Sequence, residues 1–105
     1  MTAIKTLDCA EAQTFLAQDD VLILDCRDVK DYQAGHMDGA LHAHDGLVES
    51  LIMKGDKARK ILIYCYSGHR SEHLTEFFTG FGFTDTVNLA GGYTGWLAAQ
   101  ESPVL

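Results

Sequence analysis

The chain has 105 residues, which is enough for one hydrophobic core and too few for two cores of ordinary size, so we expect one domain over residues 1–105. Hydrophobic residues make up 47% of the sequence and charged residues 22%, with a single proline, and this composition excludes the disordered and fibrous classes. The formal net charge of −7 argues against nucleic acid and anionic membrane as partners, because Lys and Arg bind those surfaces.

The sequence predicts neither a transmembrane segment nor a secretory signal. No apolar run has the length of a membrane-spanning helix, and the first residues lack the apolar stretch and small-residue cleavage site of a signal peptide. We therefore expect a cytoplasmic protein. Cys9, Cys26 and Cys65 form no CxxC pair, and an odd number of cysteines in a cytoplasmic chain argues against a disulfide framework.

Strand and helix patterns alternate along the chain. Asp8 and Glu11 have the spacing of a capping box that begins the first helix. Two apolar runs, residues 21–24 and 61–64, indicate strands buried on both faces of a parallel sheet. In chain order, the predicted elements are a strand at 4–6, a helix at 9–17, a strand at 21–24, a short helix at 28–34, a brief strand from 40, a helix at 47–54, a strand at 61–64, a helix at 71–81, a strand at 86–89 and a helix at 93–99. This alternation predicts α/β architecture with a central, mainly parallel five-stranded sheet flanked by helices on both faces.

The residues that carry chemistry follow the predicted strand at 61–64. In open α/β sheets, ligands bind at the carboxyl ends of the strands, where loops lead into helix amino termini. Cys65 lies at such a point, where unpaired backbone N–H groups and the helix dipole favour a thiolate over a thiol. Gly68 lets the loop curl so that its N–H groups converge on an anion, and Arg70 adds a positive charge. The pattern therefore predicts an activated nucleophile inside an anion-binding loop.

Four segments, taken in chain order, resemble the rhodanese homology domain family. They are residues 24–28 with Tyr32, residues 35–40, the Cys65 loop with Ser71, and residues 89–92 with Trp96. Two residues depart from the family pattern: Asp38 stands where proline is usual, and Cys26 stands where an aliphatic residue is common. The resemblance covers nearly the whole chain, and the single-domain thiosulfate sulfurtransferases look like its nearest relatives.

The resemblance implies a rhodanese-like fold and a sulfurtransferase that holds sulfane sulfur as a persulfide on Cys65. The sulfur would come from thiosulfate or a persulfide donor and pass to cyanide or a thiol acceptor, which includes protein thiols, without a metal or organic cofactor. Cysteine phosphatases have a similar loop with one more residue between cysteine and arginine, so the four residues here favour sulfur over phosphate chemistry. By the same resemblance, the six-residue loop consists of Cys65 and the substrate-binding residues Tyr66, Ser67, Gly68, His69 and Arg70.

Other interpretations stay open at this stage. The fold also suits a non-catalytic binding or sensing module, or a cysteine-dependent phosphatase or arsenate reductase-like enzyme that uses Cys65 together with Cys26. Cys26 ends the strand expected to neighbour that of Cys65, so it is either a core residue or a resolving thiol. No metal site is expected, because neither His42 with His44 nor His69 with His73 has an evident third ligand. Four further polar residues are expected to connect strand ends and turns rather than to touch substrate: Asp25, Arg27, Asp28 and His36.

Overall fold

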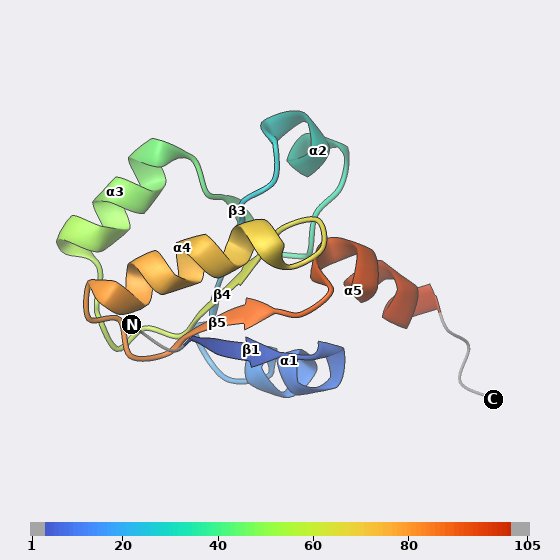
Figure 1. The fold of residues 1–105 in the computed structure, drawn as a ribbon, viewed down its shortest axis with the longest axis horizontal. Coiled ribbons are helices and arrows are strands. Elements are labelled where there is room, and N and C mark those ends of the chain that lie inside the picture. Colours follow the sequence, from blue (N-terminus) through green and yellow to red (C-terminus); the bar gives the residue numbers. More distant parts are fainter. Residues whose placement is uncertain (1–3, 102–105) are drawn as a thin grey trace.

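The structure, a computed structural model, describes residues 4–101 and is built on a five-stranded sheet in the order β1-β5-β4-β2-β3 (Figure 1). The strands are β1 (Lys5–Leu7), β2 (Leu22–Asp25), β3 (Leu41–His42), β4 (Ile61–Tyr64) and β5 (Thr86–Leu89). Every neighbouring pair is parallel. The predicted five-stranded α/β sheet is confirmed, and it is parallel throughout the described part of the chain.

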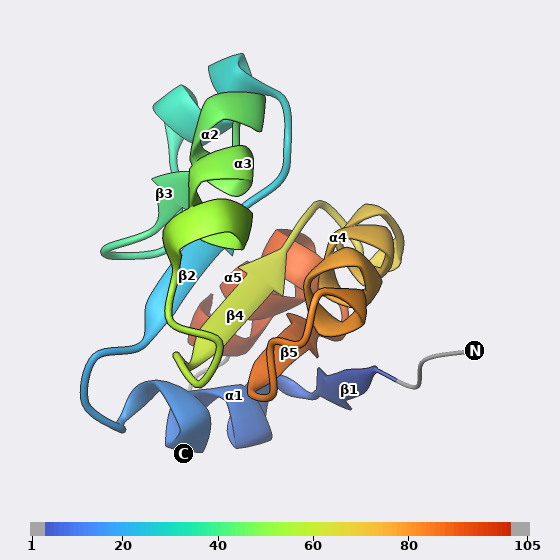
Figure 2. The same cartoon turned by 90° about the vertical axis from the view of Figure 1, so that its left-hand side faces the viewer.

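Helices cover both faces of this sheet, as predicted. The helices are α1 (Cys9–Leu16), α2 (Val29–Ala34), α3 (Asp45–Lys54), α4 (His69–Gly80) and α5 (Gly92–Glu101). Side chains of α1 and α5 pack with one face of the sheet, and side chains of α3 and α4 pack with the other. Figure 2 shows α5 behind β4, on the far side from α4. None of the helices within residues 4–101 combines the length and the apolar character needed to cross a membrane.

The central strand β4 explains why its sequence is a continuous apolar run. Leu62 and Tyr64 belong to the cluster beneath α1 and α5, whereas Ile61 and Ile63 belong to the cluster beneath α3 and α4. All four side chains are fully buried. A strand with helices on both faces has no solvent-facing position, so polar alternation disappears.

The observed bounds of α1 and α2 lie within one residue of the predicted ones, whereas the other three helices differ by up to two residues. Helix α3 begins at Asp45, two residues before its predicted start, because His44 is its N-cap, and α5 extends two residues beyond its predicted end. The capping box of α1 is confirmed, since the Glu11 N–H donates to Asp8 Oδ1 over 2.8 Å and the Asp8 N–H donates to Glu11 Oε1 over 3.0 Å. Helix α4 begins at His69, two residues before the predicted start at Ser71. The reason is Gly68, whose φ of +104° turns the chain directly into the helix. Residues 69 and 70 therefore belong to the first helical turn.

Candidate active site

Cys65 lies at the carboxyl end of β4, where a short loop connects the strand to α4. The residue is 1% exposed, and Gly68 closes the loop as the N-cap of the helix. Gly68 also approaches the turn after β5, because a Cβ placed on it would lie 3.3 Å from the Gly91 nitrogen. The predicted loop of residues 65–70 is thus a compact turn held between the ends of two neighbouring strands.

Three hydrogen bonds converge on the Cys65 sulfur. The Gly68 N–H donates to Sγ over 3.2 Å, the Ser71 N–H over 3.3 Å and the Ser71 hydroxyl over 3.3 Å. Donors of this kind stabilise the charged form of a thiol. A hydrogen bond with the Cys26 thiol and the contacts with Ser71 and Gly68 lower the pKa of Cys65 well below its ordinary value, although burial opposes them. The site therefore favours a thiolate at neutral pH.

Cys26 lies beside this thiolate. The pairing of β2 with β4 ends at Asp25 opposite Tyr64, and the Cys26 N–H then donates to the Tyr64 carbonyl over 2.9 Å. The next residues of the two strands, Cys26 and Cys65, are therefore neighbours. The hydrogen bond to Cys65, burial and the negative charge of Cys65 together raise the pKa of Cys26. Of the two sulfurs, Cys65 carries the charge and Cys26 carries the proton.

Ser71 and Asn88 form a buried polar pair next to Cys65 that sequence reasoning did not assign to the site. The Ser71 hydroxyl contacts Asn88 Oδ1, and Asn88 Nδ2 donates to the Gly68 carbonyl over 3.3 Å. A hydroxyl has a single proton, so Ser71 shares its donor between Asn88 and the Cys65 sulfur. The sequence holds one clue to this pair, because Asn88 is a polar residue within a predicted strand. The structure buries all positions of that strand, and a buried amide needs hydrogen-bond partners.

Backbone groups of the loop are free to bind an anion. Within residues 4–101, the N–H groups of Tyr66, Ser67, His69 and Arg70 donate to no protein acceptor. Those of residues 69 and 70 also lie in the first turn of α4, where the helix dipole favours negative charge. The loop therefore offers more donors than the Cys65 sulfur itself uses.

The start of α5 holds the same loop from its other side. The Tyr93 N–H donates to the Cys65 carbonyl over 2.8 Å, and the Thr94 N–H donates to the Tyr66 carbonyl over 3.2 Å. A Cβ on Gly92 would lie 2.6 Å from the carbonyl oxygens of both loop residues, and Gly92 has a φ of +57°. Glycine is therefore required at this position for a steric and a conformational reason.

The side chains of the loop point away from the sulfur. The Tyr66 hydroxyl contacts the Asp31 carboxylate, and Arg70 Nη1 lies 3.3 Å from Asp28 Oδ1, with the guanidinium 5.3 Å from the Tyr66 ring centre. The His69 side chain is 89% exposed, and Ser67 is also exposed. The side chain of Arg70 is half exposed, and its partner is a carboxylate rather than the thiolate. Anion binding here depends mainly on the backbone.

A buried ion pair connects the end of β2 to the turn after α2. Arg27 Nη2 lies 2.8 Å from Asp25 Oδ2 and donates to the Gly35 carbonyl over 2.6 Å, and the guanidinium lies 4.3 Å from the Tyr93 ring centre. The Nδ1 atom of His36 lies 2.8 Å from the Tyr32 carbonyl oxygen. Asp25, Arg27 and His36 thus connect strand ends and turns, as expected from the sequence.

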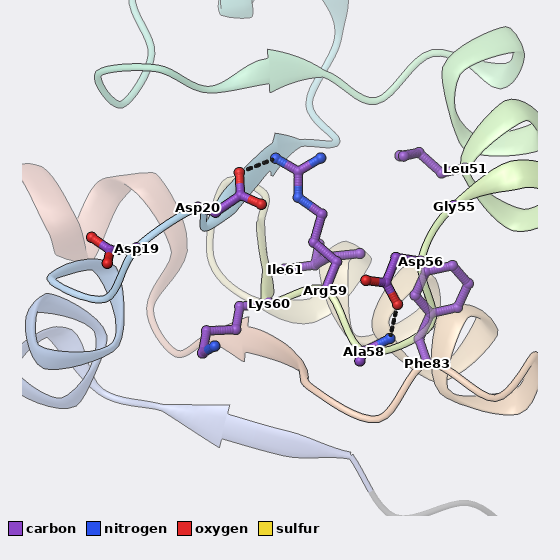
Figure 3. Close-up of a pocket in the computed structure, with 10 residues that line it drawn as sticks. All are labelled: Asp19, Asp20, Leu51, Gly55, Asp56, Ala58, Arg59, Lys60, Ile61 and Phe83. Carbon is purple, nitrogen blue, oxygen red and sulfur yellow. Dashed lines mark hydrogen bonds and ion pairs between the residues drawn. The ribbon is translucent and has the colours of Figure 1, made fainter.

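A groove and a cavity elsewhere in the structure differ in the residues that line them. A groove of 810 Å³ lies between α3 and α4; Cys26 and Arg70 line it near the site, and Met53, Phe77 and Phe81 line it near the far ends of the helices. A cavity of 380 Å³ lies near the amino ends of β2 and β4, away from Cys65, and no cysteine lines it (Figure 3). Arg59 and Asp20 form an ion pair of 3.1 Å there. Within residues 4–101, no three His, Cys, Asp or Glu side chains are placed to hold a metal ion.

Comparison with known proteins agrees with this arrangement. Residues 8–99 match the rhodanese-like domain family. The thiosulfate sulfurtransferase GlpE of Pseudoalteromonas translucida is 32% identical over 97% of both chains, and GlpE of Coxiella burnetii is 31% identical over 90% of this chain and 88% of its own.

Two solved structures have the same fold. A protein of Rhodopseudomonas palustris, described as a possible tyrosine phosphatase, has a TM-score of 0.80 and 25% identity over 97% of this chain and 85% of its own. A rhodanese-like domain protein of Staphylococcus aureus has a TM-score of 0.75 and 24% identity over 89% of this chain and 91% of its own. The chain belongs to the rhodanese-like domain family, and the curated relatives named here are sulfurtransferases.

Proposed function

We propose that this protein is a sulfurtransferase that moves sulfane sulfur from thiosulfate or a persulfide donor to cyanide or a thiol through a persulfide on Cys65. The observation that carries the proposal is the set of three hydrogen bonds on the Cys65 sulfur, from Gly68 and Ser71. A thiolate so stabilised is a nucleophile at neutral pH. The similarity to proteins named thiosulfate sulfurtransferase supports the same chemistry.

The first half-reaction loads the enzyme. The Cys65 thiolate attacks the outer sulfur of thiosulfate, a new S–S bond forms, and the bond between the two sulfur atoms of thiosulfate breaks with release of sulfite. The negative charge then lies on the outer sulfur of the persulfide. The unpaired N–H groups of Tyr66, Ser67, His69 and Arg70 are the donors available to it.

The second half-reaction returns the thiolate. Cyanide or a thiolate attacks the outer sulfur, takes it as thiocyanate or as a new persulfide, and leaves Cys65 charged as before. The loop donors hold negative charge on sulfur in both half-reactions. No proton has to move when cyanide is the acceptor, which fits a loop in which no general base contacts Cys65 among the described residues.

A second function, phosphate ester hydrolysis, deserves a parallel assay because one similar structure is described as a possible tyrosine phosphatase. The observation against it is the loop length. Only four residues separate Cys65 from Arg70, and the side chain of Arg70 pairs with Asp28. A pure binding module, in turn, has no need of a hydrogen-bonded thiolate.

The test is thiocyanate formation from thiosulfate and cyanide by the wild type, Cys65→Ser and Cys9→Ser. We expect Cys65→Ser to be inactive while keeping its fold, because a hydroxyl of similar size cannot form a persulfide. Cys9→Ser is the matched control, since Cys9 lies in α1 on the other side of the sheet. Thiocyanate formation by Cys65→Ser near the wild-type rate, or phosphatase activity without sulfur transfer in the wild type, would contradict the proposal.

A further inference from the structure

We propose that Cys26 is a second catalytic residue, which attacks the Cys65 persulfide, releases hydrosulfide and leaves a Cys26–Cys65 disulfide. This step gives the protein a further activity, the conversion of sulfane sulfur to hydrosulfide at the expense of a thiol reductant. It rests on the proposed function, because it begins from the persulfide.

The register of β2 and β4 places Cys26 and Cys65 side by side. Asp25 pairs with Tyr64, and the Cys26 N–H continues the ladder to the Tyr64 carbonyl. Cys26 and Cys65 follow these residues, so they stand beside each other on adjacent parallel strands. Such neighbours have Cα atoms about 4.8 Å apart, within the range of about 4.4–6.8 Å that a disulfide requires.

The side chains of Cys26 and Cys65 point to the same face of the sheet. Tyr64 belongs to the cluster beneath α1 and α5, so the next residue, Cys65, points to the other face. Cys26 packs against the cluster beneath α3 and α4, which contains Leu24 and Ile63. On this shared face, the Cys26 thiol is the neighbour that does most to lower the pKa of Cys65.

The charge beside Cys26 changes when the persulfide forms on Cys65. In the resting site, a hydrogen bond to Cys65, burial and the negative charge of Cys65 keep the pKa of Cys26 raised, so Cys26 stays protonated. In the persulfide, the inner sulfur is neutral and the charge lies one atom further out. The two causes that depend on a charged Cys65 sulfur therefore weaken, whereas the nearby charge of Arg70 continues to lower the pKa of Cys26. Loading the site with sulfur therefore activates Cys26.

Cys26 transfers its proton to the outer sulfur, and its thiolate attacks the Sγ atom of Cys65. The Cys26–Cys65 bond forms, the bond to the outer sulfur breaks, and that sulfur leaves as hydrosulfide with the bonding electron pair. The sulfane sulfur is reduced and the two cysteines are oxidised to a disulfide. A small dithiol or two monothiols then reduce the disulfide and restore the resting site.

The groove between α3 and α4 provides the route for that reductant. Cys26 lines this groove, whereas Cys65 is 1% exposed. Attack on a disulfide requires access to one of its two sulfurs. The reductant therefore approaches Cys26 from the groove and leaves the Cys65 sulfur as the departing thiolate, which the loop donors stabilise.

The experiment loads the wild type, Cys26→Val and Cys9→Ser with one equivalent of thiosulfate without cyanide or thiol. Sulfide is then measured, and the cysteine peptides are mapped by mass spectrometry. We expect the wild type and Cys9→Ser to release close to one sulfide per chain and to contain a Cys26–Cys65 disulfide that dithiothreitol reduces. Cys26→Val should keep the added sulfur on Cys65 and release at least tenfold less sulfide.

The outcomes separate this inference from the proposed function. A wild type that keeps a Cys65 persulfide and a free Cys26 thiol would overturn the inference and leave the proposed function intact. If neither the wild type nor Cys26→Val acquires sulfur on Cys65, both the inference and the proposed function would be overturned. Cys26→Ala provides a second variant, and the disulfide mapping of the wild type needs no substitution at all.

Discussion

Replacing Gly92 with alanine tests whether the start of α5 holds the active-site loop. The backbone of Gly92 has a φ of +57°, and the added Cβ would lie 2.6 Å from the carbonyl oxygens of Cys65 and Tyr66. Neither oxygen can move freely, because Tyr93 and Thr94 donate hydrogen bonds to them over 2.8 and 3.2 Å. The substitution must therefore displace the loop, the start of α5, or both.

The expected magnitude has two parts. A left-handed backbone conformation costs a residue with a Cβ about 1–2 kcal/mol. Forced overlap in a packed region adds about 1–3 kcal/mol. We expect the free energy of unfolding of Gly92→Ala to fall by about 2–5 kcal/mol. The matched control is Gly82→Ala, because Gly82 has a φ of +95° but its added Cβ would meet no atom within 4 Å.

Urea unfolding and thiocyanate formation together check this reasoning. Gly82→Ala should lose about 1–2 kcal/mol of stability and keep its activity when folded. Gly92→Ala should lose more stability, and its kcat/KM should fall roughly ten- to a hundredfold even where it is fully folded, because a displaced loop weakens a hydrogen bond to a charged sulfur. Equal losses of stability in the two variants, with full activity in Gly92→Ala, would refute the steric argument.

Three further predictions concern the surroundings of the thiolate. Ser71→Ala should raise the pKa of Cys65 by about one pH unit, because a shared hydrogen bond to the charged sulfur is lost. The thiolate is the form that reacts with an alkylating agent, and it is lost as the pH falls through this pKa. Alkylation of Cys65, measured by peptide mapping, should therefore decline at a higher pH in Ser71→Ala than in the wild type. Arg70→Ala should weaken thiosulfate binding by about 1 kcal/mol at low salt, which would be seen as a higher KM. The effect should be smaller at high salt, because the half-exposed charge of Arg70 is screened by dissolved ions. A KM that does not change at low salt would contradict this. Asp25→Ala should lower the free energy of unfolding by about 3–5 kcal/mol, because it leaves the buried guanidinium of Arg27 unpaired, and urea unfolding measures the loss.

Most of the fold was predictable because it depends on local patterns. The capping box at Asp8, the apolar runs of β2 and β4 and the spacing of apolar residues in α3 are all readable within one element. The start of α4 was misplaced by two residues for a local reason as well. A glycine with positive φ turned the chain earlier than the apolar spacing indicates.

The site was predictable only where its residues are consecutive. The loop from Cys65 to Arg70 could be proposed from consecutive residues. The direction of the Arg70 side chain could not, because its partner Asp28 is 42 residues away in the chain. Ser71 and Asn88 were missed as members of the site for a similar reason. Their contact depends on the packing of α4 against β5.

The strand order explains why four segments that are each weak signals together define one site. β4 carries Cys65, and its two neighbours in the sheet are β2 and β5. The segment after β2 brings Cys26 to one side of the sulfur, and β5 with the turn after it brings Asn88 and Gly92 to the other side. Because the strands are parallel, their carboxyl ends lie on the same side of the sheet, and the three segments that follow them meet there. Cys26 is therefore placed by the sheet itself, and we expect a substitution there to change the fate of the Cys65 persulfide without changing the loop.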